Sequence, residues 1–304
     1  KVGVDKEIRK VALPMKGRIM HGLDSSLSHQ SYGKEGQAIY SVSRGGLNCV
    51  LMDLAEEEGV EIHYNERCTQ VDLKKSVAHF ENFTTGKMIE VTSDHIISTD
   101  GAFSAGRLQM QLNTDRFNYS QTYLEHGYKE LTIPPNANGD FAMDPDALHI
   151  WPRGTFMLIA LPNMDKSFTC TLFFPFEGEY SFNSLDTEEK MLAFFNRMFP
   201  DAVALMPTLK EDYFANPASS LAIVRCFPWS FEDKLLLIGD AAHAIVPFYG
   251  QGMNCGFEDC VVFDQLMEEH GDDWSKIFRH FERLRKPDGD AIADLALANF
   301  IEMR

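Results

Sequence analysis

Positive charge is scarce in this sequence, because 28 Lys and Arg residues stand against 45 Asp and Glu, a formal net charge of −17. Such a balance argues against a protein that binds the phosphate backbone of nucleic acids. A run of 18 apolar residues is also missing, so no transmembrane helix is predicted. The six cysteines include no C-x-x-C pair and form no recognisable disulfide framework, and reduced thiols are therefore expected.

Two further motifs are absent. The ten histidines show no H-x-x-x-H pair or other metal-ligand spacing, so no metal site is predicted. The dinucleotide-binding fingerprint G-x-G-x-x-G does not occur, because the glycines at 33–36 and 45–46 have the wrong spacing. What the chain does have is an ordinary globular composition, with 44% apolar and 24% charged residues, and its 304 residues suffice for about two domains.

The pattern of apolar residues predicts a mixed α/β fold with a second, antiparallel domain. Apolar residues at 47, 50, 51, 54 and 55 have a helical period, and Gly59 is expected to end that helix. Short strands are expected at 18–21, 38–42, 60–64, 77–80, 88–91 and 95–98. The middle third, rich in aromatic and β-branched residues, predicts antiparallel strands at 149–151, 155–161 and 168–174, a helix at 187–199 and a strand at 221–226.

The segment 234–260 carries the strongest functional signal. Leu235–Ile238 predict a buried parallel strand that leads to Asp240, a loop rich in Pro and Gly follows, and a helix is expected from Met253. A carboxylate at the carboxyl end of a buried strand suits a sugar or ribityl hydroxyl. Glycines let a flat ligand approach the backbone, and a helix N-terminus offers N–H groups to an anionic group. The alternative interpretation is a strand–loop–helix connection with incidental glycines.

The residues G-D-A-A-H-x-x-x-P-x-x-G-Q-G-M-N in this segment resemble the second FAD-binding motif of the single-component flavin aromatic hydroxylases. Further stretches are similar to one group among them, the kynurenine 3-monooxygenase family, and lie at 118–120, 126–128, 130–135, 148–153, 157–164, 167–172 and 299–304. The resemblance implies an α/β (mixed α+β) fold. It places a Rossmann-like FAD-binding domain, incomplete at its N-terminus, in residues 1–112 and 229–304, and an inserted antiparallel-sheet substrate domain in residues 113–228.

The resemblance also implies which residues contact FAD. Asp240 is expected to hold the ribityl chain, while Met253 and Asn254 face the pyrimidine edge of the ring, where a helix N-terminus favours the reduced, anionic flavin. Asp100 begins a D-G motif expected to serve both FAD and NADPH. The full set expected to bind the cofactor is Arg44, Cys68, Asp100, Gly101, Asp240, Gly250, Gln251, Gly252, Met253 and Asn254.

For the substrate, the resemblance implies kynurenine, which presents an α-carboxylate, an α-amine and an aniline ring. A guanidinium with a phenol hydroxyl alongside suits a carboxylate, and Arg18 and Tyr32 lie where the family places that pair. Taken alone, a surface arginine and a loop tyrosine are the alternative interpretation. Asn299 matches a further polar contact. The apolar wall around the ring is expected from Leu148, Ile159, Leu161, Phe173, Pro247 and Phe248.

The implied reaction is an NADPH-consuming 3-hydroxylation of L-kynurenine by O₂ through a flavin hydroperoxide. Because the flavin carries the chemistry, no side chain is expected to be catalytic, and His243 is expected to be structural. The tasks left to the protein are to orient the ring, fix the carboxylate and exclude water. In the family pattern D-G-x-x-S-x-V-R, Gly106 replaces an apolar residue, which leaves the packing of the following helix in doubt.

By the resemblance, two parts of the family's sequence lie outside this chain. One is the segment that bears G-x-G-x-x-G, and the other is a tail that completes the pocket and anchors eukaryotic forms to the outer mitochondrial membrane. The chain alone is therefore expected to be a soluble fragment that binds FAD weakly and turns over little. Two alternatives remain open: a related flavin hydroxylase of another aromatic acid, and an inactive truncated product.

Overall fold

The computed structural model describes residues 3–34 and 36–303, which form two compact units. Unit 1 contains Glu61–Tyr123 and Ala222–Glu302, and unit 2 contains Gly3–Val60 and Leu124–Leu221. Residues 3–60 thus group with the middle of the chain, whereas the resemblance places them in the first FAD-binding part, together with its short substrate-facing strands. The division at 112 and 228 into FAD-binding and substrate domains stays a prediction.

Unit 2 is built around a sheet whose strands come from distant parts of the sequence. Its strands run in the order β13 (Ser219–Phe227), β9 (Asn118–Ile133), β12 (Phe168–Pro175), β11 (Met157–Pro162), β10 (Ala147–Pro152), β2 (Gly17–His21) and β3 (Leu27–Ser31). β10, β11 and β12 are antiparallel neighbours, which confirms the predicted sheet. β2 joins β10 in parallel, although well over a hundred residues separate the two strands.

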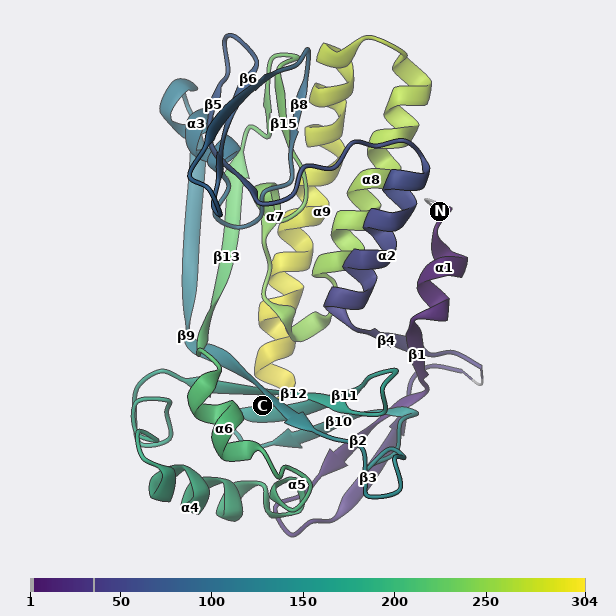
Figure 1. The fold of residues 1–304 in the computed structure, drawn as a ribbon, viewed down its shortest axis with the longest axis vertical. Coiled ribbons are helices and arrows are strands. Elements are labelled where there is room, and N and C mark those ends of the chain that lie inside the picture. The colour runs from purple at the N-terminus through teal and green to yellow at the C-terminus, as the bar shows by residue number, and fades with distance from the viewer. Residues whose placement is uncertain (1–2, 35, 304) are drawn as a thin grey trace. The chain divides into compact units, whose positions relative to one another are not determined.

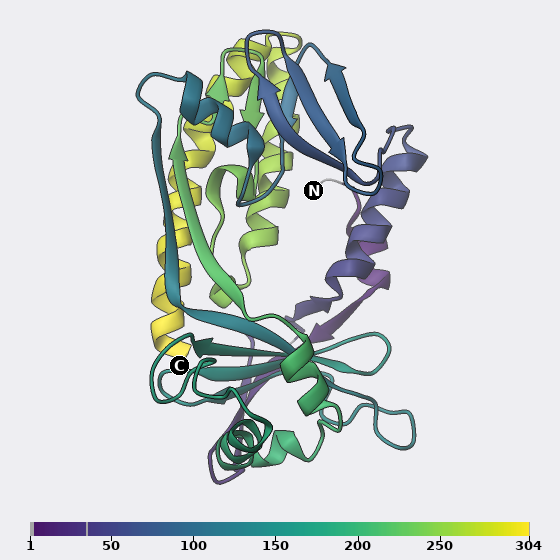
Figure 2. The ribbon, with the colours of Figure 1, turned by 60° about the vertical axis from the view of Figure 1, so that its left-hand side comes forward.

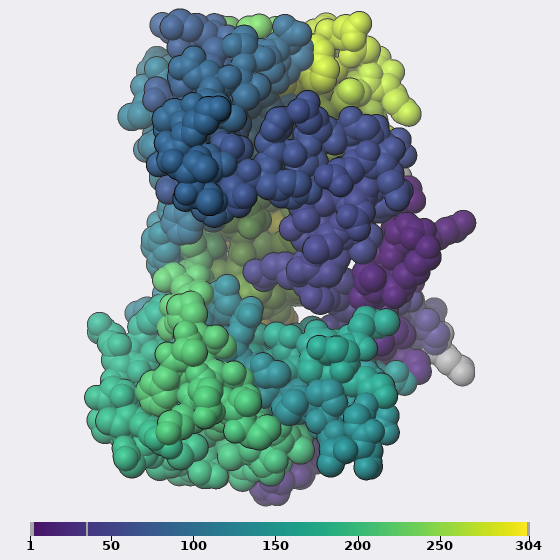
Figure 3. Space-filling view, in the orientation of Figure 1, coloured from purple at the N-terminus to yellow at the C-terminus, as the bar shows by residue number. Residues whose placement is uncertain are grey.

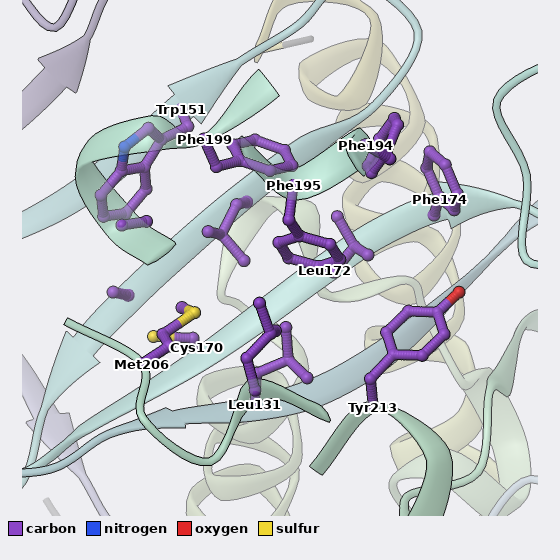
Figure 4. Close-up of a cluster of buried hydrophobic side chains, with 14 of the residues drawn as sticks. Leu131, Trp151, Cys170, Leu172, Phe174, Phe194, Phe195, Phe199, Met206 and Tyr213 are labelled. Carbon is purple, nitrogen blue, oxygen red and sulfur yellow. The ribbon is translucent and has the colours of Figure 1, made fainter. Parts of the chain in front are cut away.

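One face of this sheet packs against the helices α4 (Glu188–Met198), α5 (Pro200–Val203) and α6 (Leu209–Ala215), as Figure 1 shows. Figure 4 shows the core between them, in which Trp151 and Phe174 of the sheet meet Phe194, Phe195 and Phe199 of the helical side. Each fully buried large apolar side chain contributes about 1.5–3 kcal/mol. This aromatic core supports the sheet from one side.

The remaining elements of unit 2 are α1 (Asp5–Lys10), the antiparallel pair β1 (Ala12–Met15) and β4 (Ile39–Val42), and α2 (Arg44–Glu57). The Ser43 side chain caps α2 by accepting a hydrogen bond from the Gly46 N–H at 3.3 Å. Gly59 follows the helix with a φ of +84°, as predicted for its end. Leu47 is the buried residue of α2, and the space-filling view in Figure 3 shows this helix, in purple-blue, at the surface.

Residues 60–64 form no strand in the described structure, so this prediction is wrong. The alternation of apolar and polar residues is present, but Val60 and Tyr64 are 54% and 53% exposed. Without a neighbouring strand or a buried face, alternation alone does not stabilise extended backbone. The strand begins instead at Glu66.

Unit 1 contains two small sheets and most of the long helices. β5 (Glu66–Asp72), β6 (Val77–Asn82) and β7 (Met88–Thr92) form an antiparallel sheet. In the other sheet, β15 (Leu235–Leu237) lies between β14 (Ser230–Phe231) and β8 (Ile96–Ser98) and runs parallel to β8, which confirms a buried parallel strand. The helices are α3 (Ala105–Asn113), α7 (Asp240–His243), α8 (Gly252–His270) and α9 (Trp274–Met303), with the short 3-10 helix η1 (Pro247–Tyr249).

Figures 1 and 2 show α8 and α9 running side by side within unit 1. In the described residues, none of the helices combines the length and the apolar character that crossing a membrane requires. All six cysteines are free thiols, as predicted. The mixed α/β character expected from the sequence is confirmed.

Candidate functional site

The loop segment, residues 239–254, connects β15 to α8 and contains the strongest motif of the sequence. The three leucines of β15 are completely buried, which fixes the start of the segment. Gly239 then turns the chain with φ 62° and ψ −140°, a conformation open to glycine alone. Asp240 follows at the carboxyl end of the strand and is exposed, the position that suits a bound hydroxyl.

At its other end, the loop segment passes through Gly250, in the left-handed conformation with φ 63°, into the N-terminus of α8. In the described part of the chain, α8 has no side-chain cap and no acidic residue in its first turn. Met253, 48% exposed, and Asn254 stand at this end of the helix. The N-terminal amides of α8 can therefore receive an anionic group, and the assignment of the loop segment to FAD stays a prediction.

Asp100 and Gly101 follow β8, the strand that pairs with β15. Oδ2 of Asp100 accepts the Ala105 N–H at 2.6 Å, and Oδ1 accepts the Ser98 hydroxyl at 2.5 Å. Partial burial opposes ionisation, but hydrogen bonds from Ser104 and Ser98 outweigh it and lower the pKa of Asp100. The carboxylate is thus ionised and organises the start of α3, and its role toward FAD and NADPH stays a prediction.

Gly106 resolves the doubt about the packing of α3. A Cβ at this residue would lie 2.9 Å from the Ser98 Cβ and closer still to the Ser98 hydroxyl. α3 therefore rests directly on β8, with Gly106 buried at the contact. The glycine permits a closer approach of helix and strand than the apolar residue of the family pattern would.

Cys68 and Arg44 lie in different units. Cys68 is on β5, where the pairing with β6 shifts register between Cys68 and Gln70, and its thiol donates to the Gln70 carbonyl at 3.8 Å. Burial raises the pKa of this thiol. Arg44 is the exposed first residue of α2 in unit 2. Both assignments to FAD stay predictions.

A buried polar cluster beside the loop segment was only partly predicted from the sequence, which pointed to His243 but not to its partners. Nε2 of His243 lies 2.6 Å from Oδ2 of Asp259, whose Oδ1 accepts Nε of Arg285 at 2.7 Å. Burial would lower the pKa of His243, but the bonds to Asp259 and Cys255 raise it to about 9, so the imidazole is charged at neutral pH. These bonds agree with a structural role for His243.

The same cluster brings together three ligand types that metal ions use. His243, Cys255 and Asp259 offer ligand atoms within 4.8 Å of one another. Arg285, however, approaches the Cys255 sulfur at 3.4 Å as well as binding Asp259, and its fixed positive charge repels a cation. The cluster is an ion-pair network. The sequence signal for it was Asp259, an acidic residue at a buried position of α8.

Five predicted substrate residues of unit 2 share one face of the sheet. Arg18 pairs with Leu148 across β2 and β10, Ile150 pairs with Ile159, and Ile159 pairs with Thr171. Because side chains alternate along a strand and registered partners point the same way, these pairings place a defined set on one side. The five predicted substrate residues on this side, which form the sheet face, are Arg18, Leu148, Ile159, Leu161 and Phe173. Ile150, Thr171 and, through its pairing with Thr171, Glu130 lie on the same side of the sheet.

The sheet face is opposite to the aromatic core, and its members except Phe173 are only partly buried. At its edge, Nε of Arg18 donates to Oε1 of Gln30 at 2.7 Å, a partner that the sequence did not indicate. Tyr32 follows β3, and its N–H donates to the Lys16 carbonyl at 2.8 Å, which places it on the same side as Arg18. Burial raises the pKa of Tyr32, against the opposing effect of Arg18, so its hydroxyl stays protonated.

A hollow of about 150 Å³ lies beside Arg18 and is lined also by His29, Gln30, Asp144 and Asp146. Asp144 and Asp146 add negative charge to this hollow, which weakens the long-range attraction of an anion. Arg18 therefore binds a carboxylate mainly through directed hydrogen bonds.

The other three predicted substrate residues, Pro247, Phe248 and Asn299, lie in unit 1. Nδ2 of Asn299 on α9 donates to the Phe248 carbonyl at 2.5 Å, and the ring of Phe248 stacks on Phe300 with centroids 4.0 Å apart. Asn299 thus holds η1 in place. A direct contact of these residues with substrate stays a prediction.

Comparisons with known proteins define the class first. The family model described as "FAD binding domain" matches residues 1–271. The fold is similar to that of 2-methyl-3-hydroxypyridine-5-carboxylic acid oxygenase, with a TM-score of 0.75 and 19% identity over 97% of this chain and 75% of that chain. It is also similar to a tetracycline destructase, with a TM-score of 0.67 and 17% identity over 99% of this chain and 76% of that chain. The chain is thus an FAD-binding-domain protein.

Curated relatives narrow this class. Kynurenine 3-monooxygenase of Flavobacterium psychrophilum is 51% identical over 301 residues, which cover 99% of this chain and 67% of that protein. The kynurenine 3-monooxygenase of Dictyostelium discoideum is 48% identical over 318 residues, covering 100% of this chain and 68% of that protein. The chain belongs to the kynurenine 3-monooxygenase family of flavoprotein monooxygenases and spans about two thirds of the length of these relatives.

Proposed function

We propose that this protein binds FAD and uses NADPH and O₂ to hydroxylate L-kynurenine at position 3 of its ring. The observation that carries the proposal is the sheet face, where one guanidinium stands at the edge of an apolar surface. Kynurenine has the complementary layout, a carboxylate at one end and an aromatic ring at the other. Family membership and the fit of the loop segment to a flavin supply the cofactor.

In this proposal, the loop segment and the residues of the D-G motif hold FAD. Asp240 binds the ribityl hydroxyls, Gly250, Gln251 and Gly252 bring the backbone close to the ring, and Met253 and Asn254 face its pyrimidine edge. When bound, FAD supplies the hydride acceptance and oxygen activation that no side chain of the chain provides. The positive end of α8 stabilises negative charge at the ring, which assists reduction.

The substrate residues orient the ring and exclude water from it. Arg18 binds the α-carboxylate in a charge-assisted contact, with the protonated Tyr32 hydroxyl as a second donor. Leu148, Ile159, Leu161 and Phe173 of unit 2 form an apolar surface along which the aniline ring lies, and Pro247 and Phe248 of unit 1 are proposed as further apolar contacts. Asn299 acts by holding the Phe248 backbone. Water must be excluded because, in its presence, the activated oxygen is lost as hydrogen peroxide before it reaches the substrate ring.

The test is NADPH oxidation by the native protein with L-kynurenine or with other aromatic acids. The proposal predicts oxidation that depends on L-kynurenine and a product one oxygen atom heavier, with that atom drawn from isotopically labelled O₂. A stronger response to another aromatic acid would assign a related hydroxylase instead. Lack of a response to every acid, in a protein that folds and is supplied with FAD, would support an inactive product.

A further inference from the structure

Asp259 on α8 binds three separate elements of unit 1 with one carboxylate. Oδ2 accepts the backbone N–H of Gly239 at 3.0 Å and faces Nε2 of His243 at 2.6 Å, while Oδ1 accepts Nε of Arg285 at 2.7 Å. Asp259 is completely buried. It therefore connects the turn after β15, the helix α7 and the helix α9 at a single point without help from solvent.

The charges in this cluster make these connections stronger than ordinary hydrogen bonds. A buried carboxylate between an imidazolium and a guanidinium forms charge-assisted bonds, roughly twice as strong as neutral ones. Arg285 is balanced on its other side by Glu258 at 2.9 Å and Asp288 at 2.8 Å, and it also donates to the Cys255 carbonyl. Removing the Asp259 carboxylate would take its acceptor from the buried His243 imidazole and from the Gly239 N–H, whereas Arg285 would keep Glu258 and Asp288.

The position of Asp259 relates it directly to the loop segment. Gly239 immediately precedes Asp240, and Asp259 lies five residues after Asn254, about 7.5 Å of helix rise. The carboxylate thus ties the start of the loop segment to α8, the helix that begins at the other end of the segment. The middle of the segment has separate anchors, since the Val224 N–H donates to the Ala244 carbonyl at 2.9 Å and Asn299 donates to the Phe248 carbonyl.

His243 is also confined by packing. Its ring lies 5.0 Å from that of Trp229, and a Cβ at Gly289 of α9 would come within 3.2 Å of the His243 side chain. The donor that faces Asp259 therefore has little freedom to turn away, and the geometry of the cluster is set before any ligand arrives.

We propose that Asp259 is a positioning residue for the flavin, because it fixes the distance between Asp240 and the N-terminus of α8 in the cofactor-free protein. This inference rests on the proposed function, in which both ends of the loop segment contact FAD. A preorganised segment binds with less loss of conformational entropy than one that must be ordered by its ligand. Loss of the carboxylate then lowers FAD affinity beyond any loss of stability.

The experiment measures FAD affinity of the native protein after removal of its flavin, together with its melting temperature. Asp259→Asn is compared with Glu282→Gln, a matched control. Glu282 is another buried carboxylate of unit 1, and its Oε2 accepts the N–H groups of Trp229 and Ser230 and the Ser230 hydroxyl, at 3.0, 3.0 and 2.9 Å. Both variants lower the melting temperature, but only Asp259→Asn is expected to weaken FAD binding, by about tenfold or more.

A second pair of variants keeps the test decisive if Asp259→Asn does not fold. His243→Ala removes one donor to Asp259, and His243→Gln restores an N–H at similar reach. Affinity for FAD is expected to fall in the first and to recover in large part in the second. Equal FAD affinities in these variants and in Glu282→Gln, at equal loss of stability, would overturn the positioning role. Failure of the unaltered protein to bind FAD would instead overturn the proposed function.

Discussion

Arg18 is the basic residue among the predicted substrate residues of the sheet face, and its guanidinium is the proposed anchor for the kynurenine carboxylate. Arg18→Gln is expected to raise KM for L-kynurenine by about 10- to 100-fold, because a hydrogen bond to a charged group contributes about 1.5–3 kcal/mol. The fall in kcat should be smaller, since the carboxylate is bound in the ground state and the transition state alike. Steady-state kinetics of NADPH oxidation measure both.

Arg9→Gln is the control for this substitution, because it removes the same charge from an exposed residue of unit 2 whose partner is Asp5. It should leave KM unchanged. If both variants raise KM equally, or neither does, Arg18 is not the anchor.

His243 makes the stability of the protein depend on pH. Burial alone lowers its pKa, but Asp259 and Cys255 raise it from 6.5 to about 9. A raised pKa means that the stabilisation is fully present below about pH 6.5 and is lost as the pH rises through about 9. The free energy of unfolding should therefore fall by on the order of 3 kcal/mol more in the unaltered protein than in His243→Gln between these limits.

Chemical denaturation across this pH range measures the difference. The groups that face His243 are Asp259 and Cys255, and Arg285 stays charged throughout. Parallel pH profiles for the two proteins would show that the imidazole is neutral in the fold.

At the scale of elements, the N-terminus of α8 is where stability and cofactor binding make opposite demands. Asn254→Asp places a carboxylate in the first turn, which should stabilise α8 by about 0.3–1 kcal/mol through the helix dipole. The same carboxylate repels the partly negative carbonyl oxygens of the pyrimidine edge that Asn254 is proposed to face, so FAD affinity should fall by about tenfold. Thermal unfolding without flavin and fluorescence titration with FAD measure the two effects.

Gln265→Glu adds the same charge to an exposed residue toward the other end of α8. It should leave FAD affinity unchanged. An Asn254→Asp variant that binds FAD as tightly as this control would contradict the placement of the flavin at the start of the helix.

The contact of α3 with β8 is the second element-scale feature open to test. Gly106→Ala adds a methyl group where the Ser98 side chain already stands, and overpacking of this kind costs about 1–3 kcal/mol. Gly256→Ala, in α8, is the matched control because a Cβ there meets open space, and it should be neutral or stabilising by up to about 1 kcal/mol. Equal stabilities in urea would show that α3 can shift away from β8.

At the scale of the whole molecule, the sequence predicted individual helices and strands better than it predicted which strands pair with each other. The strands β10 to β12 and the unit β15–loop–α8 were predictable because their apolar runs and glycines are local signals. The parallel pairing of β2 with β10 was not, because no local pattern records which distant strand fills an edge. The strand predicted at 60–64 was wrong for the converse reason. The alternating pattern is present there, but in the described structure these residues pair with no neighbouring strand.

The residues of the candidate site also differ in how far the sequence alone could predict them. The loop segment was visible as a motif, and Arg18 was found by resemblance, whereas the shared face of Arg18, Leu148, Ile159 and Phe173 became visible only through strand register. Asp259 and Arg285 have no spacing signature with His243, because they come from different helices. Networks that join elements through side chains are therefore the part that sequence reasoning misses.

Every role proposed for the loop segment depends on whether this protein binds FAD. The most direct measurement is the visible absorption spectrum of the purified native protein, followed by release and quantification of any flavin. We expect flavin absorption bands and about one FAD per chain, with the bands displaced when L-kynurenine is added. A folded native protein without these bands, which also fails to take up added FAD, would contradict the proposed binding of FAD.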